Sequence, residues 1–233
     1  MKKKISRLAI IPARSGSKRI LNKNIKNFNK KPIINYSINN AVNSKLFKKI
    51  HISTDSLRMK NFIEKNNNLK IDFLRIKKLS TDKTPLINVV KYVTKEYIKK
   101  KETYDEIWLI YACAPLTNAS DLINASKNYQ RTKKKLPMMS FRKYDAPIEW
   151  SFTKKKNFFI PNFKNKITID SKKIKPNYYE SASFIIFKPE QLIKNIKFSK
   201  YYGHELPRER AIDIDDLSDW KIAESLYKFN YEI

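Results

Sequence analysis

The apolar positions of this chain recur in two spacings that alternate along its length. Short runs rich in Ile, Val and aromatic residues have the length of buried strands, whereas longer stretches repeat apolar residues every three or four positions, as one face of a helix does. The short runs predict strands at residues 5–12, 49–53, 71–75, 106–112, 138–141, 183–187 and 211–214. The longer stretches predict helices at residues 32–44, 56–65, 86–99, 120–131 and 217–229.

The order of these elements indicates the class of fold. Up to residue 141, each predicted strand is separated from the next by a predicted helix. Strands joined through helices of this length usually lie parallel in one sheet, with right-handed crossovers. We therefore predict an α/β domain with a mainly parallel sheet. The near-continuous apolar run at residues 5–12 predicts a strand that is buried on both sides.

The pattern changes between residues 143 and 176. Short apolar runs at residues 158–160 and 167–169 stand between clusters of Lys and Asn, and no stretch there has convincing helical spacing. We interpret this segment as a β-rich insertion or flap. A length of 233 residues fits one domain, so we expect a single domain over residues 1–233 that includes this flap.

The chain is strongly basic, with 50 Lys and Arg against 22 Asp and Glu and a formal charge of +28. Such a charge can bind nucleic-acid phosphates, so a basic nucleic-acid-binding protein without catalysis is one interpretation. Only nine of the basic residues are Arg, however, and base readout and bidentate phosphate contacts favour Arg. We therefore attribute the Lys excess to composition and do not expect a nucleic-acid partner.

Two features bear on where the protein is found. The basic residues Met1 to Lys4 precede a short apolar run that ends at Pro12, too short for a membrane span or a signal-peptide core. The single cysteine, Cys113, has no partner for a disulfide. We expect a soluble, cytoplasmic protein that makes no membrane contact.

Gly16 is one of only two glycines and follows directly after the first predicted strand, in IIPARSGSKR. A glycine there lets the backbone turn sharply and approach a phosphate closely, and ligands of open α/β sheets bind beyond the carboxyl ends of strands. Ser15 and Ser17 add hydroxyl donors. The cations that could neutralise a triphosphate are Arg14, Lys18, Arg19 and Lys23. The alternative is a basic surface turn, since the loop is neither GxxxxGKS nor GxGxxG.

A second candidate site lies in ERAIDIDD at residues 209–216. In a strand, Asp213 and Asp215 would present two carboxylates to one side while Ile212 and Ile214 faced the core. Two carboxylates without His or Cys suit Mg²⁺, which completes its shell with water and substrate phosphates. The alternative is that an acidic residue caps the helix predicted from residue 217. Both can hold together, with Asp216 as the cap.

Further motifs stand between these two in a recognisable order. They are ISTD at residues 52–55, Arg75 with LSTD at 79–82, YACAPLT at 111–117 and IDID at 212–215. The opening IIPARSGSKRI-LNKN is similar to the IPARGGSK-x-x-x-x-KN signature of the CMP-sialic acid synthetase (acylneuraminate cytidylyltransferase) family. Within that family, Tyr111 in place of Gln, together with residues 144–152 and 179–184, resembles the pseudaminic acid branch.

The resemblance implies a Rossmann-like nucleotidyltransferase fold, a three-layer sandwich, that moves CMP from CTP to the anomeric hydroxyl of a nine-carbon keto sugar acid and releases pyrophosphate. The nucleotide-binding positions that it implies are Ala13, Arg14, Ser15, Gly16, Ser17, Lys23, Arg75, Ser80 and Asp82, with Ser80 and Asp82 near the cytosine and ribose. It implies sugar contacts at Tyr111, Glu149 and Glu180, and Mg²⁺ on Asp213 and Asp215. The catalytic set is then Arg14, Lys23, Asp213 and Asp215.

The chain departs from the family pattern at several positions. Ser15 stands where the family has Gly, Glu149 where it has Gln, and Glu180 where it has Asp. Ser181 and Ser183 also differ, so activation of a sialic, legionaminic or Kdo-type acid stays open, as does a paralogue that binds without turnover. We further expect a homodimer in which the flap at residues 143–176 helps wall the sugar pocket of its neighbour.

Overall fold

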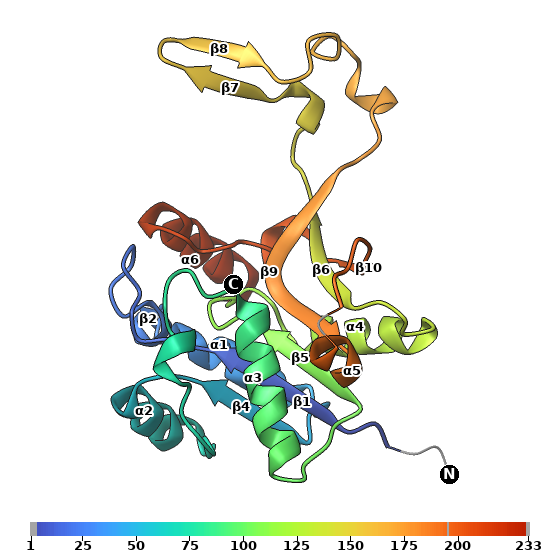
Figure 1. Ribbon diagram of the computed structural model, residues 1–233. Coiled ribbons are helices and arrows are strands. Elements are labelled where there is room, and N and C mark those ends of the chain that lie inside the picture. The colour runs from blue at the N-terminus through green and yellow to red at the C-terminus, as the bar shows by residue number, and fades with distance from the viewer. Residues whose placement is uncertain (1–3, 195, 232–233) are drawn as a thin grey trace.

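The computed structural model describes residues 4–194 and 196–231. Its centre is a six-stranded sheet in the order β10-β6-β9-β5-β1-β4 (Figure 1). The strands are β1 (Arg7–Pro12), β4 (Lys49–Ser53), β5 (Glu106–Ile110), β6 (Met138–Lys143), β9 (Tyr178–Phe187) and β10 (Tyr202–Glu205). Within this sheet only β9 runs against its neighbours, β5 and β6, while the β1, β4, β5 and β6, β10 pairings are parallel. The prediction of a mainly parallel sheet is confirmed.

Helices cover both faces of this sheet and make it a three-layer sandwich (Figure 1). One face carries α1 (Ile33–Asn43), α2 (Leu57–Asn67) and α4 (Ala119–Arg131), and the other carries α3 (Leu86–Lys99) and α5 (Pro189–Ile193). Ala9 and Ile11 of β1 pack on the first face, whereas Leu8 and Ile10 pack on the second. All four side chains are fully buried. The prediction that this strand is buried on both sides is therefore confirmed.

A smaller core beside the sheet holds the C-terminal helix α6 (Leu217–Tyr231). Trp220 of α6 meets Phe28 edge to face, with ring centroids 5.5 Å apart. The same core buries Ile20, from the loop after β1, and Ile214, from the segment before α6. Burial of these two side chains in one cluster holds two parts of the chain together that lie far apart in sequence.

The insertion extends from the sheet as a long arm (Figure 1). It contains η3 (Ile148–Trp150), the hairpin of β7 (Phe152–Lys155) and β8 (Phe158–Pro161), and η4 (Ser171–Lys173). The prediction of a β-rich flap is confirmed, but the apolar run at residues 167–169 lies in turns and is not a strand. Phe158 and Phe159 are 73% and 65% exposed. The hairpin therefore presents large apolar side chains to solvent.

Two predicted strands are wrong, at residues 71–75 and 211–214. The first makes one backbone hydrogen bond beyond the end of β4, from the Arg75 N–H to the Thr54 carbonyl at 2.7 Å. The second is held by side chains instead of a neighbouring strand. Conversely, β10 and α5 were not predicted, because each is short and β10 consists of Tyr, Gly, His and Glu.

Among the described residues, no helix has both the length and the apolar character that crossing a lipid bilayer requires.

Candidate active site

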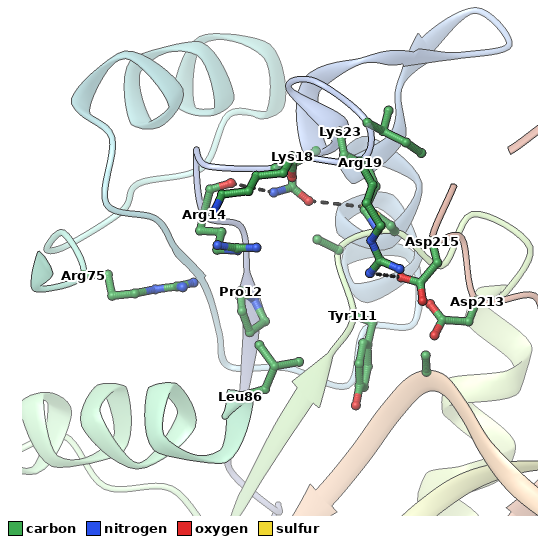
Figure 2. Close-up of a pocket in the computed structure, with 16 residues that line it drawn as sticks. Pro12, Arg14, Lys18, Arg19, Lys23, Arg75, Leu86, Tyr111, Asp213 and Asp215 are labelled. Atoms are coloured by element: carbon green, nitrogen blue, oxygen red, sulfur yellow. Dashed lines mark hydrogen bonds and ion pairs between the residues drawn. The ribbon is translucent and has the colours of Figure 1, made fainter. Parts of the chain in front are cut away.

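A cavity of about 200 Å³ opens at the carboxyl end of β1 (Figure 2). Open α/β sheets bind their ligands at this edge. The cavity is lined by the loop after β1, the start of α3, the residues that follow β5 and the segment before α6. The predicted site residues that line it are Arg14, Ser17, Lys23, Arg75, Tyr111, Asp213 and Asp215, together with Lys18 and Arg19. The basic loop and the acidic pair therefore share one cavity, as predicted.

The loop after β1 is fixed by two polar side chains. The N–H and the hydroxyl of Ser15 both donate to the carboxylate of Asp55, at 3.0 and 3.2 Å. The Asn24 amide donates to the carbonyl of Arg14 at 2.9 Å. Ser15 does not line the cavity, so its hydroxymethyl group serves to anchor the loop. Asp55 and Asn24 belong to the ISTD and LNKN motifs, but the sequence pattern predicts no role for either residue.

Gly16 and Ala13 are the two small residues of this loop, and their contacts with a nucleotide stay predictions. Gly16 does not have positive φ, and a Cβ there would lie 3.9 Å from the flexible Arg14 guanidinium, which is an ordinary contact. A sharp turn therefore does not explain this glycine, although room for a close ligand remains. The Ala13 N–H donates to the Ser53 carbonyl at 2.8 Å and its side chain is fully buried, so Ala13 extends the pairing of β1 with β4.

Three of the four loop cations, Arg14, Lys18 and Arg19, already have carboxylate partners. Arg14 and Lys18 both pair with Asp82, Lys18 at 2.7 Å, and Arg19 pairs with Asp215 at 2.6 Å. Hydrogen bonds from Lys18 and Arg14 hold the pKa of Asp82 below its usual range. A bound triphosphate would compete with these carboxylates for the same cations.

Ser80 and Asp82, the predicted neighbours of the cytosine and ribose, do not line the cavity. Asp82 contacts the two cations described above, and the Ser80 hydroxyl donates to the Ile76 carbonyl at 3.1 Å. The structure thus places Asp82 beside cations of the phosphate loop.

Arg75 supplies a fixed cation from a segment that is not a strand. Its Nε donates to the Ser53 hydroxyl at 3.1 Å, and a second nitrogen donates to the Ser53 carbonyl. Burial lowers the pKa of the Arg75 guanidinium to about 10, although Asp55 opposes the shift. The group remains protonated at neutral pH.

The acidic segment, residues 211–216, is fixed by side-chain donors and by the start of α6. The Lys23 ammonium donates to the Ile214 carbonyl at 2.5 Å. Asp216 accepts from the N–H groups of Ser218 and Asp219, at 2.7 and 3.0 Å, so the prediction that Asp216 caps the helix is confirmed. Asp219 accepts in turn from the N–H of Asp215 at 2.9 Å. Asp213 and Asp215 are left lining the cavity.

The acidic pair fits a divalent cation. Burial raises the pKa of Asp213, and the charge of Asp215 raises it further, while Lys23 opposes the shift. A carboxylate in this state gains from a nearby positive charge, and two carboxylates are hard oxygen donors of the kind that Mg²⁺ binds. Among the described residues, no group of three or more His, Cys, Asp or Glu side chains gathers as a metal site. Water and a substrate phosphate would have to supply the other ligands.

A second, larger cavity of about 710 Å³ adjoins the first between α3 and α5. The two cavities share Leu86 and Tyr111. The Tyr111 hydroxyl donates to Glu180, and burial together with this carboxylate raises the tyrosine's pKa, so it stays a hydrogen-bond donor. The remaining wall is mostly apolar, with Leu109, Met139, Ile185 and Phe187 on the sheet and part of residues 196–201 outside it. Sequence reasoning did not identify this outer wall, because the segment has no regular pattern.

Glu149, the third predicted sugar contact, lies apart from Tyr111 and Glu180. It is in η3, at the base of the flap, and lines neither cavity of its own chain. Its Oε2 atom is buried without a hydrogen-bond partner among the described residues.

Seven residues of the first cavity's lining were not predicted to belong to the site, and two of them, Ala182 and Cys113, have unusual properties. Ala182 of β9 has φ of 50°, the left-handed region that favours glycine. Cys113 donates through Sγ to Asn24 at 3.3 Å, and burial raises the pKa of its thiol to about 12. Cys113 is therefore a poor nucleophile.

Comparisons with known proteins agree with this geometry. The family model for cytidylyltransferases matches residues 8–209. The chain is 32% identical to a pseudaminic acid cytidylyltransferase of Campylobacter jejuni over 228 residues, 97% of each chain. It is 26% identical to a CMP-N,N'-diacetyllegionaminic acid synthase of Legionella pneumophila over 230 residues, again 97% of each. A solved CMP:2-keto-3-deoxy-manno-octonic acid synthetase complexed with CTP has a TM-score of 0.70 at 12% identity, over 97% of this chain and 99% of that one.

Proposed function

Since this chain belongs to the cytidylyltransferase family, we propose that it transfers CMP from CTP to the anomeric hydroxyl of a nonulosonic acid, pseudaminic acid before others, and releases pyrophosphate. One observation carries the proposal. A small cavity lined by four loop cations and two carboxylates opens beside a larger, mostly apolar one, and Tyr111 lies at their junction. The first suits a triphosphate and the second a sugar acid.

The reaction is an in-line displacement at the α-phosphorus of CTP. The anomeric oxygen attacks, the bond to pyrophosphate breaks, and the hydroxyl proton leaves to solvent or a carboxylate. Arg14, Lys18 and Lys23 hold the triphosphate and offset the charge that grows on pyrophosphate. No covalent nucleophile is needed, which is consistent with the high thiol pKa of Cys113.

We assign Mg²⁺ to Asp213 and Asp215, supported by their shared cavity and by the raised pKa of Asp213. When bound, Mg²⁺ would polarise the α-phosphate and lower the pKa of the attacking hydroxyl. Arg19 pairs with the Oδ1 atom of Asp215 at 2.6 Å, and the other oxygen of this carboxylate would be the one to meet the cation. Lys23, between the loop and Ile214, keeps the acidic segment at the phosphates.

The acceptor sugar acid is placed in the larger cavity. Tyr111 and Glu180 offer one donor and one acceptor at its inner end, next to the phosphate cations. Its apolar walls suit the methyl and acyl groups of pseudaminic acid better than a fully hydroxylated acid. Similarity to a legionaminic acid synthase makes legionaminic acid the second candidate.

We propose that the enzyme is a homodimer whose flaps cross between subunits. The support is the exposed Phe158 and Phe159 on an arm that extends from its own sheet, and the position of Glu149 outside both cavities of its chain (Figure 1). A second copy would cover the arm and could bring Glu149 to its neighbour's sugar cavity. Sedimentation of a monomer with full activity would contradict this arrangement. We place the reaction in the cytoplasm, where CTP is made and where a lone thiol such as Cys113 stays reduced.

The test is pyrophosphate release from CTP and Mg²⁺ with pseudaminic, legionaminic, sialic and Kdo acids supplied one at a time. We expect pseudaminic acid to give the highest kcat/KM, with UTP and ATP giving no more than background. Pyrophosphate release with only one of the other acids would make that acid the substrate instead. No release with any acid, from a folded protein that binds CTP, would leave only a binding function.

A further inference from the structure

Arg142 lies at the end of β6, where the flap begins, and its side chain is 9% exposed. A buried guanidinium carries a charge that its surroundings must satisfy with hydrogen bonds. One of its nitrogens, Nη1, donates to the carbonyl of Ala211 at 3.1 Å. Ala211 lies two residues before Asp213, so this bond joins the root of the flap to the acidic segment.

Among the described residues, no strand pairs with the acidic segment to fix its backbone. Instead, two cations from different parts of the chain hold two of its carbonyls. Arg142 holds the carbonyl of Ala211, and Lys23 holds that of Ile214 at 2.5 Å. Asp213 lies between these two points in sequence, so the backbone that carries its carboxylate is held before and after it.

The orientation of Arg142 is set by residues at both ends of the flap. Its Nη2 donates to Asp145 at 2.7 Å, and Asp145 also pairs with Arg208 at 3.2 Å. On the returning strand β9, the ring of Tyr179 lies 5.7 Å from the guanidinium carbon. The planar guanidinium can reach a carbonyl and a carboxylate at once, which a Lys ammonium cannot reproduce in the same geometry.

We propose that Arg142 is a positioning residue that holds the acidic segment in its metal-binding arrangement and ties it to the root of the flap. This inference rests on the proposed function, because it takes Asp213 and Asp215 as the metal-binding pair. Arg142 contacts neither substrate nor metal. Its effect passes through the backbone of residues 211–215.

The test measures binding of Mn²⁺ as the probe, in the presence of CTP and without sugar acid, from the free Mn²⁺ signal in electron paramagnetic resonance. We expect Arg142→Gln to weaken Mn²⁺ by about ten-fold or more, the usual effect of losing a residue that orients a metal ligand. The Mg²⁺ concentration at half-maximal kcat should rise to match, while the CTP KM at saturating Mg²⁺ stays within about three-fold of wild type. Arg142→Lys should lie between Gln and wild type.

Arg208→Gln is the matched control, because it removes a side-chain cation from the same network and leaves in place the backbone hydrogen bond from the Ala211 N–H to the Arg208 carbonyl at 3.5 Å. Its side chain is 74% exposed, and it should bind Mn²⁺ as wild type does. Wild-type Mn²⁺ affinity in a folded Arg142→Gln protein would overturn the inference. If Arg142→Gln does not fold, Arg142→Lys is the test variant, and wild-type Mn²⁺ affinity in Arg142→Lys would then overturn the inference.

Asp213→Asn separates this inference from the proposed function. If Asp213→Asn leaves Mn²⁺ binding unchanged, the metal assignment itself is wrong. If Asp213→Asn abolishes binding while both Arg142 variants bind normally, only the positioning role is wrong.

Discussion

Removal of the Lys23 ammonium should weaken CTP binding much more than sugar binding. Lys23 lines the first cavity, where we place the triphosphate, and its ammonium is fixed by a 2.5 Å hydrogen bond to the Ile214 carbonyl. Its charge is therefore held between the basic loop and the acidic pair before substrate arrives. The variant Lys23→Ala removes both the charge and this link.

The magnitude follows from the partial burial of Lys23. A hydrogen bond to a charged group contributes about 1.5–3 kcal/mol, and each 1.4 kcal/mol is about a factor of ten in affinity. We therefore expect the CTP KM to rise by about 10- to 100-fold. The sugar-acid KM should change by less than about three-fold, because Lys23 does not line the larger cavity.

The assay is steady-state pyrophosphate release at saturating Mg²⁺, with CTP and sugar acid varied in turn. Lys26→Ala is the matched control: it removes a nearby lysine whose ammonium lies 5.8 Å from the Trp220 ring and which does not line the cavity. An equal rise of the CTP KM in both variants would show that only the total positive charge of the region matters. An unchanged CTP KM in Lys23→Ala would refute the role of Lys23.

Four other changes test separate parts of the site. Asp213→Ala or Asp215→Ala should lower kcat by about 100-fold or more, and a near-wild-type rate would remove that residue from the metal site. Without metal, Asp213→Asn should melt at a higher temperature than wild type near pH 8, because the raised pKa of Asp213 means that folding disfavours its ionised form. This difference in melting temperature should shrink as the pH falls through the pKa of Asp213, since the wild-type carboxylate is then protonated. Asp82→Asn should lower the CTP KM a few-fold by freeing two loop cations, whereas a higher KM would show that Asp82 contacts the nucleotide. Ala182→Gly should change the free energy of unfolding in denaturant by less than about 1 kcal/mol. Glycine relieves backbone strain of about 1–2 kcal/mol at positive φ, but it also raises the conformational entropy of the unfolded chain, which offsets this gain. Ala9→Gly in β1, where no such strain exists, should clearly lower the free energy of unfolding.

The strength of the hydrophobic signal explains which elements sequence could predict. The run in β1 is unambiguous because its side chains are buried on both faces of the sheet. Residues 71–75 have the apolar content of a strand, but the Ile71 N–H donates to the Glu64 carboxylate at 2.7 Å instead of to a strand. In residues 211–214 the alternation of Ile and Asp arises because Ile214 packs in the α6 core while Asp213 lines the cavity.

Residue type and spacing alone predicted the two charged motifs of the site, whereas Arg75 and Tyr111 followed only from the resemblance to a known family. Gly16 with its neighbouring cations, and the paired carboxylates, carry their chemistry in residue type and spacing. Pairing between residues distant in sequence does not: nothing in the sequence shows that Asp82 meets Arg14, or that Asp55 receives Ser15. The sequence also does not predict the positive φ of Ala182, because residues within a strand normally have negative φ and alanine does not favour the left-handed region.

The central claim is that one CTP molecule lies across the basic loop while a divalent cation joins it to the acidic pair. A crystal structure of the chain with CTP and Mn²⁺, without sugar acid, tests it directly through the anomalous signal of the metal. We predict a manganese peak bound by Asp213, Asp215 and a phosphate oxygen, with the triphosphate in contact with Arg14 and Lys23. A triphosphate bound elsewhere, or a manganese peak away from these carboxylates, would contradict it.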